Sequence, residues 1–221
     1  RIGFALINIC QLKIYSGSYA SAVIDAKNAQ EYYIQNSFNT AISKEQEFYA
    51  YFYNSDQYNA LKCIEDLLEH SLIDTGEFRK SKYIYYQSCV LFDSGKYKAT
   101  LDLLKMSLEI EKDKTRWNIS LRILNIIIFI ELDKIDEAGR SLESLRKHME
   151  RQIKEEEVKP RDILIVKTLR ELEKNNFEFS SKNVTVIKML KELSEKDTAV
   201  AWEHFSTELI PFHKWLERRK L

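Results

Sequence analysis

The side chains that most often carry chemistry stand apart in this sequence. The four histidines are distant from one another and from the cysteines: His70, His148, His204 and His213. A zinc site needs several such ligands at short spacings, and no His-Glu-x-x-His arrangement occurs. There is also no Gly-rich phosphate loop or nucleophile elbow, and the densest acidic run, 155–157, would point its side chains in different directions on a helix. We therefore expect no enzyme activity, no metal and no cofactor.

The three cysteines, Cys10, Cys63 and Cys89, lie far apart on apolar helical stretches. An odd number at this spacing predicts small buried hydrophobic residues rather than disulfides. Buried reduced thiols indicate a reducing compartment, so we expect a cytoplasmic location. Because the chain starts at Arg1 inside an apolar run that extends to Ile14, we expect it to be the C-terminal part of a longer protein.

The charges of the chain cancel, with 34 basic and 34 acidic residues. Binding to nucleic acid depends on an excess of positive charge, so we expect no nucleic-acid partner in this region, although 218–220 is locally basic. The most apolar stretch, Ile119 to Leu132, is shorter than the roughly 20 residues that span a bilayer. It predicts a buried helix, and no transmembrane segment is expected.

The elements that must position these residues are helices joined by a recurring turn. With only 5 Gly and 2 Pro, the composition favours long helices and an all-α fold. Short polar turns recur at Gly17, Asp56, Gly95 and Asp133, at spacings of 39, 39 and 38, and a step of 42 reaches Asn175. A fixed period of this length is typical of stacked repeats.

The period divides the chain into about five helical hairpins and a closing helix. The predicted hairpins cover 1–38, 39–77, 78–114, 115–158 and 160–195, and a C-terminal capping helix covers 198–220. A solitary helix suits the end of a stack, whose last apolar face must be covered. We expect residues 1–221 to form a single helical-repeat domain.

The turns and the residues after them resemble the tetratricopeptide-repeat superfamily (TPR-like). The match is carried by Gly17-Ser18-Tyr19 with Ala22, Gly95-Lys96-Tyr97 with Thr100, and Asp133-Lys134-Ile135 with Ala138. The chain departs from the family in its period, which exceeds about 34 residues, and in Leu61, which stands where Ala is expected. The resemblance implies a right-handed α-α superhelix, or solenoid, whose concave face binds peptides or partner proteins.

The resemblance also implies which side chains face that groove. The residues assigned to partner binding are Gln11, Gln46, Tyr53, Lys82, Tyr85 and Phe92. At the places of the two-carboxylate clamp of chaperone-binding members, only Lys82 has the matching type, so a chaperone C-terminal peptide is not expected. The corresponding places in the fourth hairpin are apolar (Ile123, Ile127 and Ile130), and we expect the C-terminal helices to cover them through Trp202, Phe205 or Trp215.

The resemblance and the absence of catalytic motifs suggest two functions of different classes. The first is a protein–protein interaction scaffold that holds a peptide or partner protein on its concave face. The alternative is a ligand-sensing regulatory module of a transcriptional or signalling protein, which would suit a segment of a longer chain.

Overall fold

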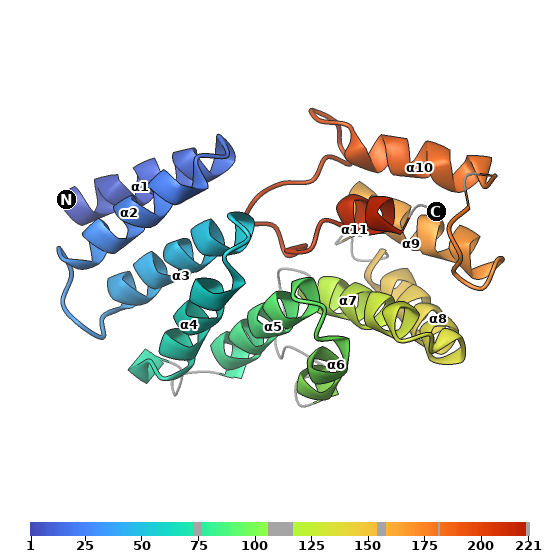
Figure 1. Cartoon of the computed structure of the whole chain (residues 1–221), viewed down its shortest axis with the longest axis horizontal. Coiled ribbons are helices and arrows are strands. Elements are labelled where there is room, and N and C mark those ends of the chain that lie inside the picture. Colours follow the sequence, from blue (N-terminus) through green and yellow to red (C-terminus); the bar gives the residue numbers. More distant parts are fainter. Residues whose placement is uncertain (73–76, 106–116, 154–157, 181, 220–221) are drawn as a thin grey trace. The chain divides into compact units, whose positions relative to one another are not determined.

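The computed structural model describes residues 1–72, 77–105, 117–153, 158–180 and 182–219. In the range 117–153 it describes side chains up to residue 151. These ranges contain helices and connecting segments and no strand, so the prediction of an all-α fold is confirmed. The described residues form two compact units, 1–96 and 97–219, whose helices are labelled in Figure 1. That residues 1–221 are a single repeat domain stays a prediction.

Unit 1 contains five helices in which each packs against the next along the chain: α1 (Ile2–Tyr15), α2 (Tyr19–Gln30), α3 (Phe38–Tyr53), α4 (Gln57–Leu68) and α5 (Glu77–Asp93). Helix α1 also contacts α3. The core between α3 and α5 is aromatic, since the ring of Phe48 stacks on that of Tyr86 with centroids 4.9 Å apart. Both side chains are fully buried, and their contact joins helices α3 and α5 within one unit.

Unit 2 continues the same order of packing through six helices: α6 (Tyr97–Lys105), α7 (Trp117–Glu131), α8 (Ile135–Ile153), α9 (Pro160–Glu173), α10 (Val184–Ser194) and α11 (Phe212–Arg218). Helix α7 is buried on most of its surface, as its composition predicts. Pro160 begins α9 at a position where its missing N–H costs no helical hydrogen bond. The predicted hairpin boundary at 114 lies outside the described residues.

Five turns among the described residues share one backbone geometry. Each has a residue with positive φ just past a helix end: Gly17 (78°), Ser55 (60°), Gly95 (73°), Asp133 (55°) and Asn176 (51°). In each, the next residue donates its N–H to a carbonyl five residues earlier, as Lys96 does to Leu91 (2.9 Å) and Lys134 to Phe129 (2.9 Å). This is the Schellman arrangement, which satisfies carbonyls left open at a helix C-terminus.

The second of these turns corrects the predicted register by one residue. The residue with positive φ is Ser55, because Asp56 instead accepts the N–H of Asn59 (3.1 Å) and caps the N-terminus of α4. The fifth residue after each of the first four turns is then small and fully buried: Ala22, Ala60, Thr100 and Ala138. Leu61 therefore does not occupy the small-residue place, and Tyr58 is turned outward and is 78% exposed.

The predicted capping helix over 198–220 is wrong for most of its length. Residues 195–211 are non-helical, and α11 begins only at Phe212, directly after Pro211. Asp197 and Phe205 have positive φ, which a helix does not allow. The segment nevertheless lies against α7, because Ser120 Oγ donates to Thr207 Oγ1 (2.8 Å) and Trp215 Nε1 donates to Glu131 Oε1 (2.7 Å).

The apolar face of α7 is buried, as expected. Ile123, Ile127 and Ile130 are all at most 5% exposed. On α1 the buried residues are Gly3, Ile7, Cys10 and Ile14, whereas Phe4 and Ile9 are exposed. Gly3 is buried because the ring of Tyr33 lies where a larger side chain would stand.

Candidate functional site

A hollow of about 380 Å³ lies in unit 1 where the start of α3, the end of α4 and the start of α5 meet. Ser37 is the N-cap of helix α3, and its Oγ accepts the N–H of Thr40 (3.3 Å). Phe38 is therefore in the first turn of α3 and lines the hollow. The wall is mostly apolar, and the lining residues are Phe38, Ala41, Ile42, Glu45, Leu67, His70, Leu72, Phe78, Arg79, Lys82 and Tyr83.

A buried carboxylate that accepts four hydrogen bonds from three side chains lies at one side of this hollow. Lys82 Nζ contacts both oxygens of Glu45, at 2.9 and 2.8 Å. The hydroxyls of Tyr83 and Tyr86 each donate to Glu45 at 3.1 Å. The hydroxyl of Tyr86 also lies 2.5 Å from that of Tyr49. Burial, and then the nearby charge of Glu45, raises the pKa of all three tyrosines, so these hydroxyls stay protonated.

The network fixes the side chains at this side of the hollow. A carboxylate presents about four lone-pair positions, and all four are used here. Because both Glu45 and Lys82 are largely buried, their geometry is set by packing as well as by charge. Two residues further along α3, Glu47 points to the opposite side and accepts a hydrogen bond from Gln30 of α2 (2.9 Å). Helix α3 thus carries one buried carboxylate bonded to α5, that of Glu45, and one bonded to α2, that of Glu47.

His70 brings a second polar group to the hollow. Its Nδ1 accepts the backbone N–H of Leu72 (3.2 Å), so the ring proton of the neutral imidazole lies on Nε2. Nε2 is buried and has no hydrogen-bond partner among the described residues. The guanidinium of Arg79 lies 5.7 Å from the centre of the Phe38 ring. The hollow therefore combines apolar walls with two cationic side chains, Arg79 and Lys82, of which Lys82 is paired with Glu45.

The structure brings only one of the six predicted partner-binding residues to this hollow, namely Lys82. Gln46, Tyr85 and Phe92 are buried, which gives them packing roles within the fold, and Gln11 and Tyr53 are half-buried elsewhere. Sequence reasoning missed Glu45, His70 and Arg79. The signal for the first was present, since Glu45 and Lys82 are opposite charges 37 residues apart, about one repeat length.

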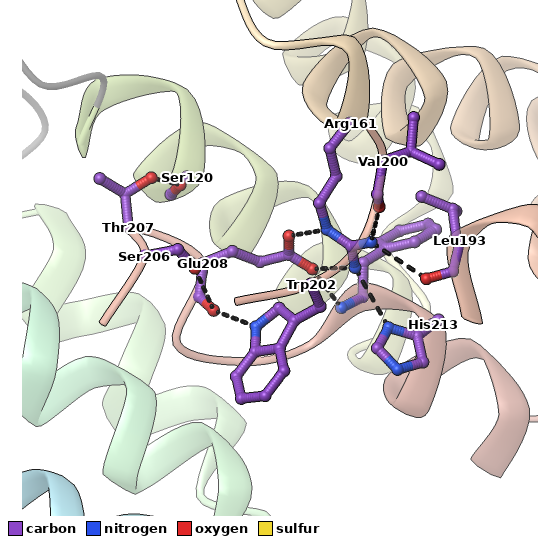
Figure 2. A network of polar contacts seen from close by, with 10 residues as sticks. Ser120, Arg161, Leu193, Val200, Trp202, Ser206, Thr207, Glu208 and His213 are labelled. Atoms are coloured by element: carbon purple, nitrogen blue, oxygen red, sulfur yellow. Dashed lines mark hydrogen bonds and ion pairs between the residues drawn. The ribbon is translucent and has the colours of Figure 1, made fainter. Parts of the chain in front are cut away.

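A second polar cluster, in unit 2, is centred on the buried side chain of Arg161. Its guanidinium pairs with both carboxylate oxygens of Glu208 (Nε 2.5 Å and Nη2 2.9 Å). It also donates to the carbonyls of Leu193 (3.0 Å) and Val200 (2.6 Å), and Nη2 lies 3.1 Å from His213 Nδ1. Figure 2 shows the guanidinium at the centre of these groups.

This Arg161 cluster holds the non-helical segment 195–211 in place. Glu208 Oε1 also accepts the N–H of Phe212 (2.7 Å). The backbone carbonyl of Glu208 accepts Trp202 Nε1–H (2.9 Å) (Figure 2). Arg161 and Glu208 are 6% and 8% exposed. Because every arm of the guanidinium is used inside the fold, we assign the cluster a structural role rather than a binding role.

Other classes of site have little support in the described part of the chain. No group of three or more His, Cys, Asp or Glu side chains there could hold a metal ion, and no helix there has the length and apolar run that crossing a membrane requires. Comparisons with protein-family models, with curated proteins and with solved structures find no match to this chain. The hollow of unit 1 is therefore the candidate site with the clearest geometry.

Proposed function

We propose that this chain is a protein-interaction module, and that the hollow between α3, α4 and α5 receives a segment of a partner protein. The observation that carries the proposal is the hollow itself, an apolar recess with polar groups held rigidly at its edge. Its volume of about 380 Å³ lies within the range of roughly 300–1,000 Å³ in which proteins bind ligands. An apolar anchor in a pocket, surrounded by oriented polar groups, is how interfaces concentrate their binding energy.

The fold supports a helical-repeat scaffold. Each helix packs against the next in both units, and the recurring Schellman turns are followed by a small buried residue at one fixed position. We propose that the chain is a tetratricopeptide-like, right-handed solenoid, with the predicted concave face as a further binding surface. The half-buried side chains of Gln11 and Tyr53 are the predicted groove residues best suited to reach a partner there.

The test is a selection of random nonapeptides displayed on phage against the full chain, followed by affinity measurements with labelled peptides. Ala41 lines the hollow, so Ala41→Leu should fill part of it and weaken the selected peptides at least tenfold. Ala20→Leu makes the same change at an exposed site on α2 and should leave binding unchanged. Both variants should keep the helical circular dichroism of the parent. Failure to select any peptide, or equal binding by Ala41→Leu, would contradict the proposal.

A second candidate is the ligand-sensing regulatory module, because the volume of the same hollow also suits a small molecule. A thermal-shift screen of small organic compounds on the full chain tests it. Stabilisation that Ala41→Leu abolishes, with no peptide selected, would favour the sensor over the scaffold.

A further inference from the structure

Helix α1 is apolar on the side that the fold leaves open as well as on the side that it buries against α2 and α3. The open side is called here the outer face of α1, and its exposed residues are Ile2, Phe4, Ala5, Asn8, Ile9, Leu12 and Tyr15. Its five large apolar side chains are 43–68% exposed. No residue from Ile2 to Leu12 is charged. A helix that is apolar on every side is typical of one that is covered on every side.

The repeat relates this outer face to a buried face of α3. Gly17 and Ser55 hold the same place in their turns, so each residue of α1 corresponds to the residue 38 positions later. Ile9 then corresponds to Glu47, which is 4% exposed and accepts a hydrogen bond from Gln30 of the preceding helix α2 (2.9 Å). The outer face of α1 is therefore the kind of surface on which this fold packs another helix.

Two further positions show the same relation. Ala5 and Leu12 of α1 correspond to Ser43 and Ala50 of α3. Both residues of α3 are 0% exposed, one turn to either side of Glu47. The positions that lie inside a helix–helix contact on α3 are thus open to solvent on α1.

The chemistry of the outer face differs from that of α3, and this difference selects what can cover it. Helix α3 presents Glu47 to the side chains of Gln30 (2.9 Å) and Lys27 (3.8 Å), whereas α1 presents Ile9 at the same place. A helix with polar groups there, such as α2, would bury them against Ile9 without a partner, which is costly. The outer face of α1 therefore requires an uncharged, apolar helix.

The outer face of α1 is itself such a surface, and it matches a second copy laid antiparallel. With a two-fold axis between residues 8 and 9, Ala5 of one copy comes opposite Leu12 of the other, and Ile2 comes opposite Tyr15. Each of these contacts occurs twice, as two-fold symmetry requires. A small residue opposite a large one lets the two surfaces interdigitate.

The open area of the outer face is close to what a stable dimer needs. At roughly 200 Å² for a fully exposed large side chain, the five large apolar residues leave on the order of 600 Å² open on each copy. This is at the upper end of the apolar patches that monomers expose, about 300–600 Å². Together with Ala5 and Asn8 it approaches the roughly 800 Å² per partner that specific interfaces bury.

We propose that the chain pairs with a second copy of itself through the outer face of α1, in an antiparallel two-fold arrangement. None of the residues of this face lines the hollow between α3, α4 and α5. Self-association through α1 and binding in the hollow are therefore separate properties with separate tests.

The test is sedimentation equilibrium of the full chain, which should show twice the chain mass of 26.2 kDa. Ile9→Lys places a charge beside the two-fold axis in each copy and should weaken pairing about a hundredfold or more, because both charges would lose water. Ile24→Lys makes the same change on α2, at a residue that is 58% exposed outside the outer face, and should leave pairing unchanged. Circular dichroism checks that both variants keep the helix content of the parent.

Two residues test the antiparallel register. Leu12→Ala alone leaves a void opposite Ala5, and Ala5→Leu alone brings two large side chains together, so each should weaken pairing about tenfold. The double variant again has one small and one large residue at each contact and should recover most of the affinity.

The outcomes decide the proposal in each case. A chain that keeps a mass of 26.2 kDa up to about 100 μM would overturn it and would leave the outer face to a helix of another protein. A dimer that Ile9→Lys and Ile24→Lys weaken equally would pair through another surface, which would also overturn it. A double variant of Ala5 and Leu12 that pairs no better than the single variants would show that the helices are not antiparallel in this register.

Discussion

Replacing Arg161 by Met should destabilise unit 2 strongly, because it removes the centre of a buried polar cluster. The side chain of Met keeps much of the volume and loses the charge and every donor. Glu208 would retain the N–H of Phe212 but would lose its ion pair, and the carbonyls of Leu193 and Val200 would lose their donors. Breaking one side of a buried ion pair costs about 3–5 kcal/mol.

The assay is urea unfolding followed by tryptophan fluorescence. All three tryptophans, Trp117, Trp202 and Trp215, lie in unit 2, so their emission reports on that unit alone. With a urea dependence of about 2 kcal/mol per M, the midpoint should fall by about 1.5–2.5 M. Far-UV circular dichroism, which sees both units, should show the early loss of only part of the helix signal.

Two further variants make the reasoning refutable. Lys159→Met removes a charge from an exposed residue two positions away and should change the midpoint little. The double variant Arg161→Met with Glu208→Leu removes both charges and should recover much of the lost stability. If Arg161→Met unfolds at the same urea concentration as Lys159→Met, the Arg161 cluster does not hold the C-terminal segment.

Three other predictions concern the turn at Gly95, the buried thiols of Cys10 and Cys63, and the half-buried side chain of His213. Gly95→Ala should lower the free energy of unfolding, measured in urea, by about 1 kcal/mol, because a φ of 73° strains any residue larger than glycine. Steric crowding is not the cause, since a Cβ at this position meets no atom within 4 Å. No loss of stability would contradict the assigned turn. Burial raises the pKa of Cys10 and of Cys63 to about 12, so a thiol reagent at pH 8 should react with them only on unfolding, and fast reaction with the native chain would refute their burial. Burial, then the charges of Arg161 and Lys214, lowers the pKa of His213 from an ordinary value of 6.5 to about 4. The unfolded chain therefore takes up this proton first, and stability should fall between about pH 6.5 and pH 4 by at most about 3 kcal/mol, a loss that should be absent in His213→Gln.

The turns show how far the sequence alone leads. The recurring turns contain Gly17, Gly95 and Asp133, which are residue types that tolerate positive φ. Their spacing predicted a repeated helix end, and all three have positive φ in the structure. At the second turn two residues competed for this place. Asp56 is the better helix N-cap, and its bond to Asn59 left Ser55 to take the left-handed conformation. Which of Ser55 and Asp56 adopts positive φ is thus decided by the hydrogen bond that caps α4.

The faces of the helices were harder to predict, because burial depends on what packs from both sides. Periodicity marked α1 as apolar, but only contact with its neighbours decides that Gly3 is buried and Phe4 is exposed. Tyr85 and Phe92 were assigned to a binding groove by their repeat positions and are buried in the fold. The predicted capping helix was wrong for a similar reason, since the conformation of 195–211 is set by its packing and by the pair between Arg161 and Glu208.

The sequence by itself determined the all-α class and, to within one residue, the places of the recurring turns, because these follow from local backbone preferences and from apolar spacing along one chain. Only the tertiary structure decided the candidate site. Glu45 lies on α3, His70 follows the end of α4 and Lys82 lies on α5, and their meeting depends on how these helices pack. The sequence also could not predict that Nε2 of His70 is buried without a hydrogen-bond partner among the described residues, because this results from the bond between Nδ1 and the backbone N–H of Leu72 and from the packing around Nε2.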